Sequence, residues 1–580
     1  MSIPQPKKSP ARRLLASLLE RAGVRISAKR MVIPWLDRLG IGQTVSSDDL
    51  AEDVRRFMAR SHANSPQPME PDGPAVVFFG ARALAGIPAL FTGLVSHALW
   101  LRGARTFIVL CDEVLPACES LAITDYGEIS DFLQESDRHP ACSRCFMPTV
   151  RIMQAFQLPY IRLSQYLDKD IFEQAQKLAN DLSLEEILAY QLDGADLGEQ
   201  VRTSLYRFFL TGSLKTDSQT LAVARRYFIA GFAVAQATRR IVQTLKPVCL
   251  VAHHGIYLVS GTAASVGKAM GVRIAAYDAT YRQNTIVISH DQTYHHELRS
   301  EPWSYWERRV LSEEQNRRLD EYVGARRLGS APQDYISYHP NPISDRERIK
   351  SDLGLNSHQK NAVLFTNVAW DGRVHAPDGI FPGPIEWVLD TLRYLGGRPD
   401  IRVIVRVHPA EVKNKKWITQ QRLDDEIQRA FPALPANVMV IPPESDINSY
   451  TLADLADVAI VYSTKMGLES ALMGIPLIIA GSAFYGQKGI GIDPRTHQEY
   501  HDALDRIPQM SRATPAELER IRLYAFHYYF CRTLELPVPY PNSFTRQLKT
   551  MADMTPGKQH GLDIIADGIL YGSPFVDEQG

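Results

Sequence analysis

Three polar side chains follow an apolar run at residues 401–411, IRVIVRVHPAE, and their types suit the binding of an anionic ligand. The run is typical of a buried parallel strand, and Arg406, His408 and Glu411 come at its carboxyl end. Ligands of parallel α/β sheets bind just outside the carboxyl ends of the strands. Because arginine and histidine N–H groups hydrogen-bond well to phosphate oxygens, we expect this strand end to form part of a phosphate-binding site.

A second apolar run, at 458–462, ends directly before Ser463, Thr464 and Lys465, which open a predicted helix. Backbone N–H groups and hydroxyls at a helix N-terminus, with a lysine beside them, favour a monophosphate or a diphosphate. Glu469, about one turn further, could accept hydrogen bonds from ribose hydroxyls. Serine and threonine also cap many helices, and a lone histidine is more often structural. The convergence of both sets on one end of one sheet favours a binding site.

The segment 365–381, FTNVAWDGRVHAPDGIF, follows another predicted strand of the same sheet. It adds Asn367, Trp370 and Asp371 at the edge where the phosphate site is expected. Trp370 could stack on a base or a sugar ring, because its large aromatic face offers extensive contact area.

In the first half of the chain, residues 251–261, VAHHGIYLVSG, place His253 and His254 at a strand end, and Asp278 follows the next strand. A hydroxyl that attacks another group must lose its proton to a base, and His or Asp is suited to that near neutral pH. We expect His254 to be the catalytic base, with Asp278 as the second choice. The alternative is that these residues hold inter-domain loops or form buried hydrogen bonds.

Four cysteines form a separate pattern, with a CxxC pair, CSRC, as its second half: Cys111, Cys118, Cys142 and Cys145. A cytoplasmic chain is not expected to use them as disulfides, and two cysteine pairs fit a tetrahedral, structural zinc site. The first pair is more widely spaced than usual. Four unrelated buried thiols and an iron–sulfur cluster are the alternatives, and no catalytic role is expected.

The motifs HPAE and STKMGLESALMGIPLIIAGSAFYGQKG, in this order, resemble the capsule polysaccharide biosynthesis proteins, which include the bacterial β-Kdo transferases. More distantly they resemble the teichoic acid glycerophosphotransferases. The resemblance covers roughly residues 360–495. It implies a GT-B fold, a nucleotide-activated and for example CMP-linked donor held by the C-terminal domain, and no cofactor for catalysis. It also implies that His408 and residues 463–465 contact donor phosphate and that Glu469 contacts the ribose.

One position departs from a common pattern of this fold. Many retaining GT-B enzymes have an acidic residue eight positions before the glutamate that matches Glu469, and this chain has Val461 there. The departure leaves the inverting or retaining outcome open and argues against the sucrose-synthase-like group.

The elements that carry these residues alternate between apolar strands and helices, which is typical of parallel sheets with helices on both faces. A chain of 580 residues also exceeds what one core usually supports. We therefore expect an α/β, GT-B-like protein with two doubly wound Rossmann-type domains facing a cleft. The expected parts are a basic helical arm (1–61), a first, acceptor-side domain (75–330) with a helical insert (about 148–246), a donor domain (335–505), and a C-terminal helix and tail that pack back (506–580).

The bulk charge favours no nucleic-acid partner, because 64 basic residues balance 65 acidic ones. Residues 83–101 are uncharged but contain glycines and a proline between two strands, which favours a buried helix over a transmembrane one. The first thirty residues predict a basic amphipathic helix. It either lies on an anionic membrane or docks on the protein itself. We expect a cytoplasmic protein that can lie at the inner face of the membrane.

Together these patterns predict a glycosyltransferase, metal-independent at its reacting centre. It would transfer a sugar from a nucleotide donor to a surface polysaccharide or a lipid-linked glycan. A polyol-phosphate transferase or a nucleotide-sugar epimerase on the same fold is the enzymatic alternative. A non-catalytic scaffold of a polysaccharide-assembly complex is the alternative of another class.

Overall fold

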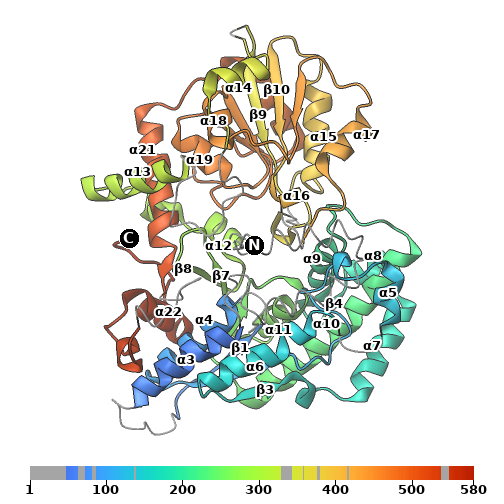
Figure 1. Ribbon diagram of the computed structural model, residues 1–580, viewed down its shortest axis with the longest axis vertical. Coiled ribbons are helices and arrows are strands. Elements are labelled where there is room, and N and C mark those ends of the chain that lie inside the picture. Colours follow the sequence, from blue (N-terminus) through green and yellow to red (C-terminus); the bar gives the residue numbers. More distant parts are fainter. Residues whose placement is uncertain are drawn as a thin grey trace, which may run out of the picture.

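The computed structural model describes residues 47–62, 72–80, 86–135, 139–327, 342–356, 358–374, 379–413, 417–536 and 548–580. The predicted basic helix within residues 1–30 lies outside this part of the chain. Within it, two α/β domains lie one above the other (Figure 1). The first described element is α3 (Ser47–His62), whose apolar side chains, among them Val54 and Phe57, join the core of the first domain.

The first domain contains a seven-stranded sheet in the order β14-β8-β7-β6-β1-β2-β3. Its parallel part consists of β1 (Ala75–Phe79), β2 (Arg105–Leu110), β3 (Tyr160–Arg162), β6 (Cys249–His253) and β7 (Arg273–Ala279). Antiparallel to β7 runs β8 (Thr285–His290), and antiparallel to β8 runs β14 (Leu534–Glu535).

The second domain contains a five-stranded, fully parallel sheet in the order β11-β10-β9-β12-β13. Its strands are β9 (Lys360–Phe365), β10 (Ile401–Arg406), β11 (Val438–Ile441), β12 (Val458–Val461) and β13 (Leu477–Ile479). The five parallel strands have the same spatial order in both sheets, β3-β2-β1-β6-β7 in the first and β11-β10-β9-β12-β13 in the second. The strand order therefore reverses between β1 and β6 and between β9 and β12, the two points at which doubly wound sheets bind ligands. The expected α/β, GT-B-like fold class is confirmed.

Helices cover both faces of each sheet (Figure 1). After α3, the helices up to residue 327 of the chain are α4 (Ile87–Trp100), α5 (Ile129–Gln134), α6 (Phe146–Ala155), α7 (Lys169–Asp181), α8 (Leu184–Leu188), α9 (Leu197–Phe209), α10 (Ser218–Leu245), α11 (Thr262–Ala269), α12 (Tyr294–Ser300) and α13 (Glu313–Arg327). The helices that follow in the chain are α14 (Arg346–Asp352), α15 (Pro384–Leu395), α16 (Ala410–Lys413), α17 (Leu423–Ala430), α18 (Ser449–Asp454), α19 (Met466–Leu472), α20 (His497–Asp505), α21 (Pro515–Phe526) and α22 (His560–Tyr571).

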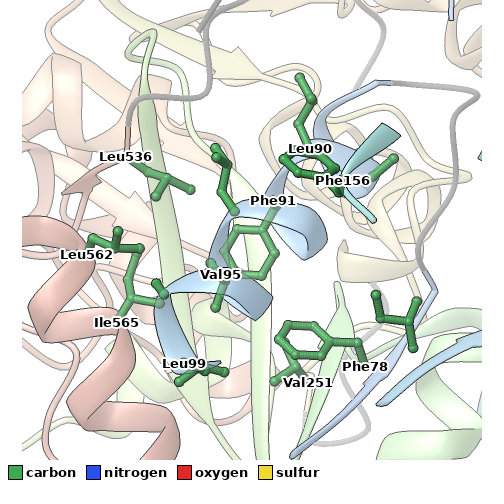
Figure 2. Close-up of a cluster of buried hydrophobic side chains, with 14 of the residues drawn as sticks. Phe78, Leu90, Phe91, Val95, Leu99, Phe156, Val251, Leu536, Leu562 and Ile565 are labelled. Atoms are coloured by element: carbon green, nitrogen blue, oxygen red, sulfur yellow. The ribbon is translucent and has the colours of Figure 1, made fainter. Parts of the chain in front are cut away.

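The uncharged stretch 83–101 contains the buried helix α4, as expected. Phe91 stacks on Tyr277 of the sheet with ring centroids 3.7 Å apart, and α22 covers the other side of α4 (Figure 2). A helix that is apolar all round is stable in water only when it is covered on both sides in this way. No helix among the described residues combines the length and the apolar character that a membrane span requires.

Some strands of the first domain differ from the sequence pattern. The short strand β3 lies inside the segment assigned to helices, as does a separate hairpin of β4 (Gln191–Leu192) and β5 (Ala195–Asp196). The strand β14 comes from the far C-terminal part of the chain and extends the first sheet. Strands of two or three residues are too short to show a period, so only tertiary pairing reveals them.

Candidate active site where the two domains meet

The loop after β6 gathers the predicted base and its neighbours. His254 Nδ1 lies 3.1 Å from Asp278 Oδ2, and His253 Nε2 lies 4.0 Å from the other carboxylate oxygen. The ligand atoms of these three residues all lie within 4.8 Å of one another. Asp278 comes near the end of β7, so adjacent parallel strands bring the histidines and the carboxylate to one edge. A carboxylate beside an imidazole stabilises the imidazolium that forms when the ring accepts a proton.

The backbone of this loop is strained. His254 and Tyr257 have φ values of 65° and 70°, a left-handed conformation that residues with a side chain rarely adopt, and Gly255 between them has φ 67°. The loop then enters η5 (Tyr257–Gly261), a π-helical turn. Strained residues cost free energy and persist only where the surrounding structure holds them, and both they and π-helical turns are frequent at functional sites.

Buried hydrogen bonds hold this strained turn in place. The N–H group of Leu258 donates to Ser204 Oγ (2.8 Å), and the N–H group of Val259 donates to Glu119 Oε2 (3.1 Å). Glu119 is itself buried and comes from the loop after β2. Elements distant in sequence therefore fix the position of His254.

In the second domain, the loop after β12 lies at the corresponding switch point. The N–H group of Ser463 donates to Asn367 Oδ1 (3.2 Å), which joins the ends of β12 and β9. The carbonyl of Thr464 accepts a hydrogen bond from the buried Tyr485 hydroxyl (2.6 Å). The seven-residue helix α19 begins directly after Lys465. The predicted Ser463–Lys465 segment is thus held rigidly at the carboxyl end of the sheet.

Lys465 connects this loop to the first domain. Its Nζ lies 3.8 Å from the ring centroid of Tyr281, a cation–π distance. Tyr281 comes three residues after Asp278, in the turn that follows β7. The sequence pattern did not single out Tyr281, because an aromatic residue in a turn carries no periodic signal.

Glu469 takes part in a buried ion pair. Its Oε1 accepts a hydrogen bond from Arg326 Nε of α13 at 2.8 Å, and the two side chains are 2% and 3% exposed. The hydroxyl of Tyr529 lies 3.5 Å from the same oxygen. In this arrangement the carboxylate links α19 to α13, and a ribose would compete with Arg326 for it.

Arg406 and Glu411 also bind groups of the protein. The Arg406 guanidinium donates to the carbonyls of Pro442 (2.8 Å) and Ser445 (2.9 Å), and burial lowers its pKa to about 10. Glu411 is fully buried, accepts a hydrogen bond from the N–H group of Leu423 at the start of α17 (3.2 Å), and burial raises its pKa to about 8. Both side chains therefore hold loops beside the strand end.

His408 and Trp370 lie on the same edge. The His408 N–H group donates to Thr366 Oγ1 (3.0 Å), and its Nδ1 accepts from the N–H group of Ala410 (3.1 Å), which fixes the orientation of the ring. Trp370 Nε1 donates to Thr419 Oγ1 (3.0 Å). The predicted base-stacking residue is thus held in place by its ring nitrogen.

A further contact between the domains starts at Tyr257. Its hydroxyl donates to Asp371 Oδ1 (3.2 Å) and accepts from the N–H group of Gly372 (3.3 Å). The Arg207 guanidinium lies between the rings of Tyr257 (4.8 Å) and Trp417 (4.6 Å). Side chains from the segments that follow β6 and β9 are therefore in direct contact, which joins the two switch points.

The four cysteines of the predicted metal site line a single cavity in the first domain. Among the described residues, His253, His254 and Asp278 form the one group of three or more metal-ligand residues whose atoms lie within 4.8 Å of one another. The cysteine sulfurs are therefore spaced more widely than in a formed metal site.

No protein-family model and no curated protein sequence matches the chain. Solved structures do match, and they include the family that the sequence motifs resemble. The KpsC β-Kdo 2,7 transferase of Thermosulfurimonas dismutans is similar over 55% of this chain and 89% of its own, with 13% identity and a TM-score of 0.33. The β-Kdo 2,4 transferase of the same organism is similar over 48% of this chain and 79% of its own, with 13% identity and a TM-score of 0.30. The UDP-GlcNAc 2-epimerase of Neisseria meningitidis is similar over 77% of this chain and 96% of its own, with 11% identity and a TM-score of 0.23.

Proposed function

We propose that the protein is a glycosyltransferase that moves a sugar from a nucleotide-activated donor to a hydroxyl of a surface polysaccharide or a lipid-linked glycan. One observation carries the proposal: the switch points of two doubly wound domains meet, through Lys465 on Tyr281 and Tyr257 on Asp371. These contacts support a site shared by the two domains, with His254 and Asp278 in one domain and residues 463–465 in the other.

The residues divide into two roles. His254 would take the proton from the acceptor hydroxyl as it attacks, while Asp278 orients the ring and stabilises its charge. Lys465, Ser463 and His408 would bind the donor phosphate and stabilise negative charge on the departing nucleotide. The pairing of Glu469 with Arg326 favours a base and ribose pocket built from other groups, Trp370 among them.

Donor binding tests the proposal without knowledge of the acceptor. Nucleotides such as UDP and CMP should raise the melting temperature of the full chain, because a ligand that binds only the folded state stabilises it. Lys465→Ala should reduce the shift at the same nucleotide concentration while the unliganded melting temperature stays the same. Absence of a shift with every nucleotide would contradict a donor site and favour the scaffold alternative.

Product analysis separates the transferase from its enzymatic alternatives. A transferase releases free nucleotide in proportion to acceptor glycosylation. Turnover of CDP-glycerol would instead indicate a polyol-phosphate transferase, and a free epimerised sugar would indicate an epimerase. Either result would contradict the proposed glycosyltransferase reaction.

A further inference from the structure

Four cysteines from two separate segments line one buried cavity of the first domain. Cys111 follows β2, and Cys118 lies in the loop after that strand. Cys142 and Cys145 flank the short turn before α6. All four are present as thiols, whereas Cys249 and Cys531 lie elsewhere in the fold. The fold thus brings two cysteine pairs, more than twenty residues apart in sequence, to the same place.

Backbone donors are already directed at two of the sulfurs. The N–H groups of Glu113 and Leu115 donate to the Cys111 sulfur, and that of Ser120 donates to Cys118. Glu113 has a φ of 69°, so a strained residue turns these N–H groups inward. N–H groups two residues after a cysteine stabilise a thiolate, and such hydrogen bonds surround metal-bound sulfurs.

The other walls of the cavity are mainly apolar, with Phe79, Leu110, Phe146 and Leu163 among them. Four cysteine sulfurs around one such cavity are the soft ligands that zinc and other thiophilic metals prefer. The chemistry of the cavity therefore suits a soft divalent metal, whose binding would release protons.

We propose that this cavity binds one Zn²⁺ as a structural tetrathiolate site, with the ligands Cys111, Cys118, Cys142 and Cys145. Zinc–sulfur distances of about 2.3 Å require the four sulfurs to come closer together than their present spacing. The ion joins the loop after β2 to the start of α6. No ligand position remains for substrate, so its role is structural.

The site also supports the loop that carries the candidate base. Glu119, next to Cys118, accepts the hydrogen bond from Val259 in η5 and lies 3.4 Å from Ser260 Oγ. The first residue of η5, Tyr257, contacts Asp371 of the other domain. Zinc bound by Cys118 thus holds the segment that positions η5 and the strained turn before it.

Metal analysis of the purified full chain tests the site directly. We expect about one zinc per chain by mass spectrometry, and loss of this zinc in Cys142→Ser and Cys118→Ser. The matched control variants Cys249→Ser and Cys531→Ser replace buried thiols outside the cavity and should keep the metal. Zinc-free wild-type protein, or undiminished zinc in both cavity variants, would overturn the proposal.

A second measurement remains decisive if the cavity variants do not fold. Wild-type protein prepared with Co²⁺ should show the absorption of tetrahedral cobalt bound by thiolates, and titration with a mercurial reagent should release bound zinc. An octahedral cobalt spectrum would overturn the thiolate site. Iron with acid-labile sulfide in the wild-type protein would replace zinc by an iron–sulfur cluster and so contradict the proposed ion.

Discussion

The two switch points carry similar polar residues, yet the fold uses them differently. In the second domain, Arg406 and Glu411 bind main-chain groups, and Glu469 forms an ion pair with a buried arginine. In the first domain, His254 lies in a strained turn that other elements hold in place, and Asp278 faces it from the end of β7. A polar residue at a strand end can therefore complete the fold or do chemistry, and only its partners distinguish the two.

This difference makes separate predictions for each region. Substitutions in the first domain should change the rate of transfer, whereas substitutions of Arg406, Glu411 or Glu469 should change stability. Lys465 should affect donor binding, because its ammonium group lies on Tyr281 between the domains.

The largest effect is expected from His254→Ala. Loss of the base should lower kcat by about 10²- to 10⁴-fold with little change in the donor KM. Initial-rate measurements with a turned-over donor provide the test. His501, whose Nε2 lies 2.8 Å from Asp390 on the outside of the second domain, offers a matched control. His501→Ala should keep full activity. An equal loss of kcat in both variants would contradict the role of His254 as the base.

Glu469→Ala should reduce the free energy of unfolding by about 3–5 kcal/mol, because it leaves Arg326 buried without its charge partner. Urea unfolding followed by circular dichroism measures this change. The exposed pair of Arg317 and Glu314 is the control, and Glu314→Ala should leave the free energy of unfolding nearly unchanged. A stable Glu469→Ala protein that no longer binds nucleotide would instead support the predicted ribose contact.

Glu411 should make stability depend on pH. Burial raises its folded-state pKa to about 8, so the folded protein holds a proton that the unfolded chain releases above about pH 4.5. Its contribution to stability is complete below that pH and is lost as the pH rises to about 8, by at most roughly 1.4 kcal/mol per pH unit.

Glu411→Gln mimics the protonated form and should remove this dependence. The free energy of unfolding, measured at pH 5 and pH 8, should therefore rise for the variant relative to the wild type as the pH rises. Glu444→Gln, at a carboxylate that is 54% exposed, is the control and should follow the wild type. Parallel curves for wild type and Glu411→Gln would contradict a buried, neutral carboxyl.

The smallest effect is expected from Lys465→Ala, which should weaken nucleotide binding about tenfold through loss of a charge-assisted hydrogen bond. Titration calorimetry with UDP or CMP measures it. Lys360→Ala, at the amino end of β9 and away from the expected site, is the control and should bind nucleotide like the wild type. Tyr281→Phe keeps the ring face and should bind like the wild type, while Tyr281→Ala should weaken binding. Unchanged affinity in Lys465→Ala would contradict the phosphate role.

The sequence by itself determined the two α/β halves and most of their strands. The apolar runs that begin at Ile401 and Val458 are strands that begin at the same residues, because buried parallel strands are continuously apolar. The strand-end position of His254, Asp278 and Lys465 also follows from the local pattern. These features depend on side chains within a few residues of one another.

Only the tertiary structure decided which polar groups have partners. The pairing of Glu469 with Arg326, the contact of Lys465 with Tyr281, and the return of β14 to the first sheet join residues more than a hundred positions apart. No local period encodes such contacts, because they arise when separate elements pack together. The same reason explains the cysteines: spacing suggested a metal site, and folding placed all four around one cavity.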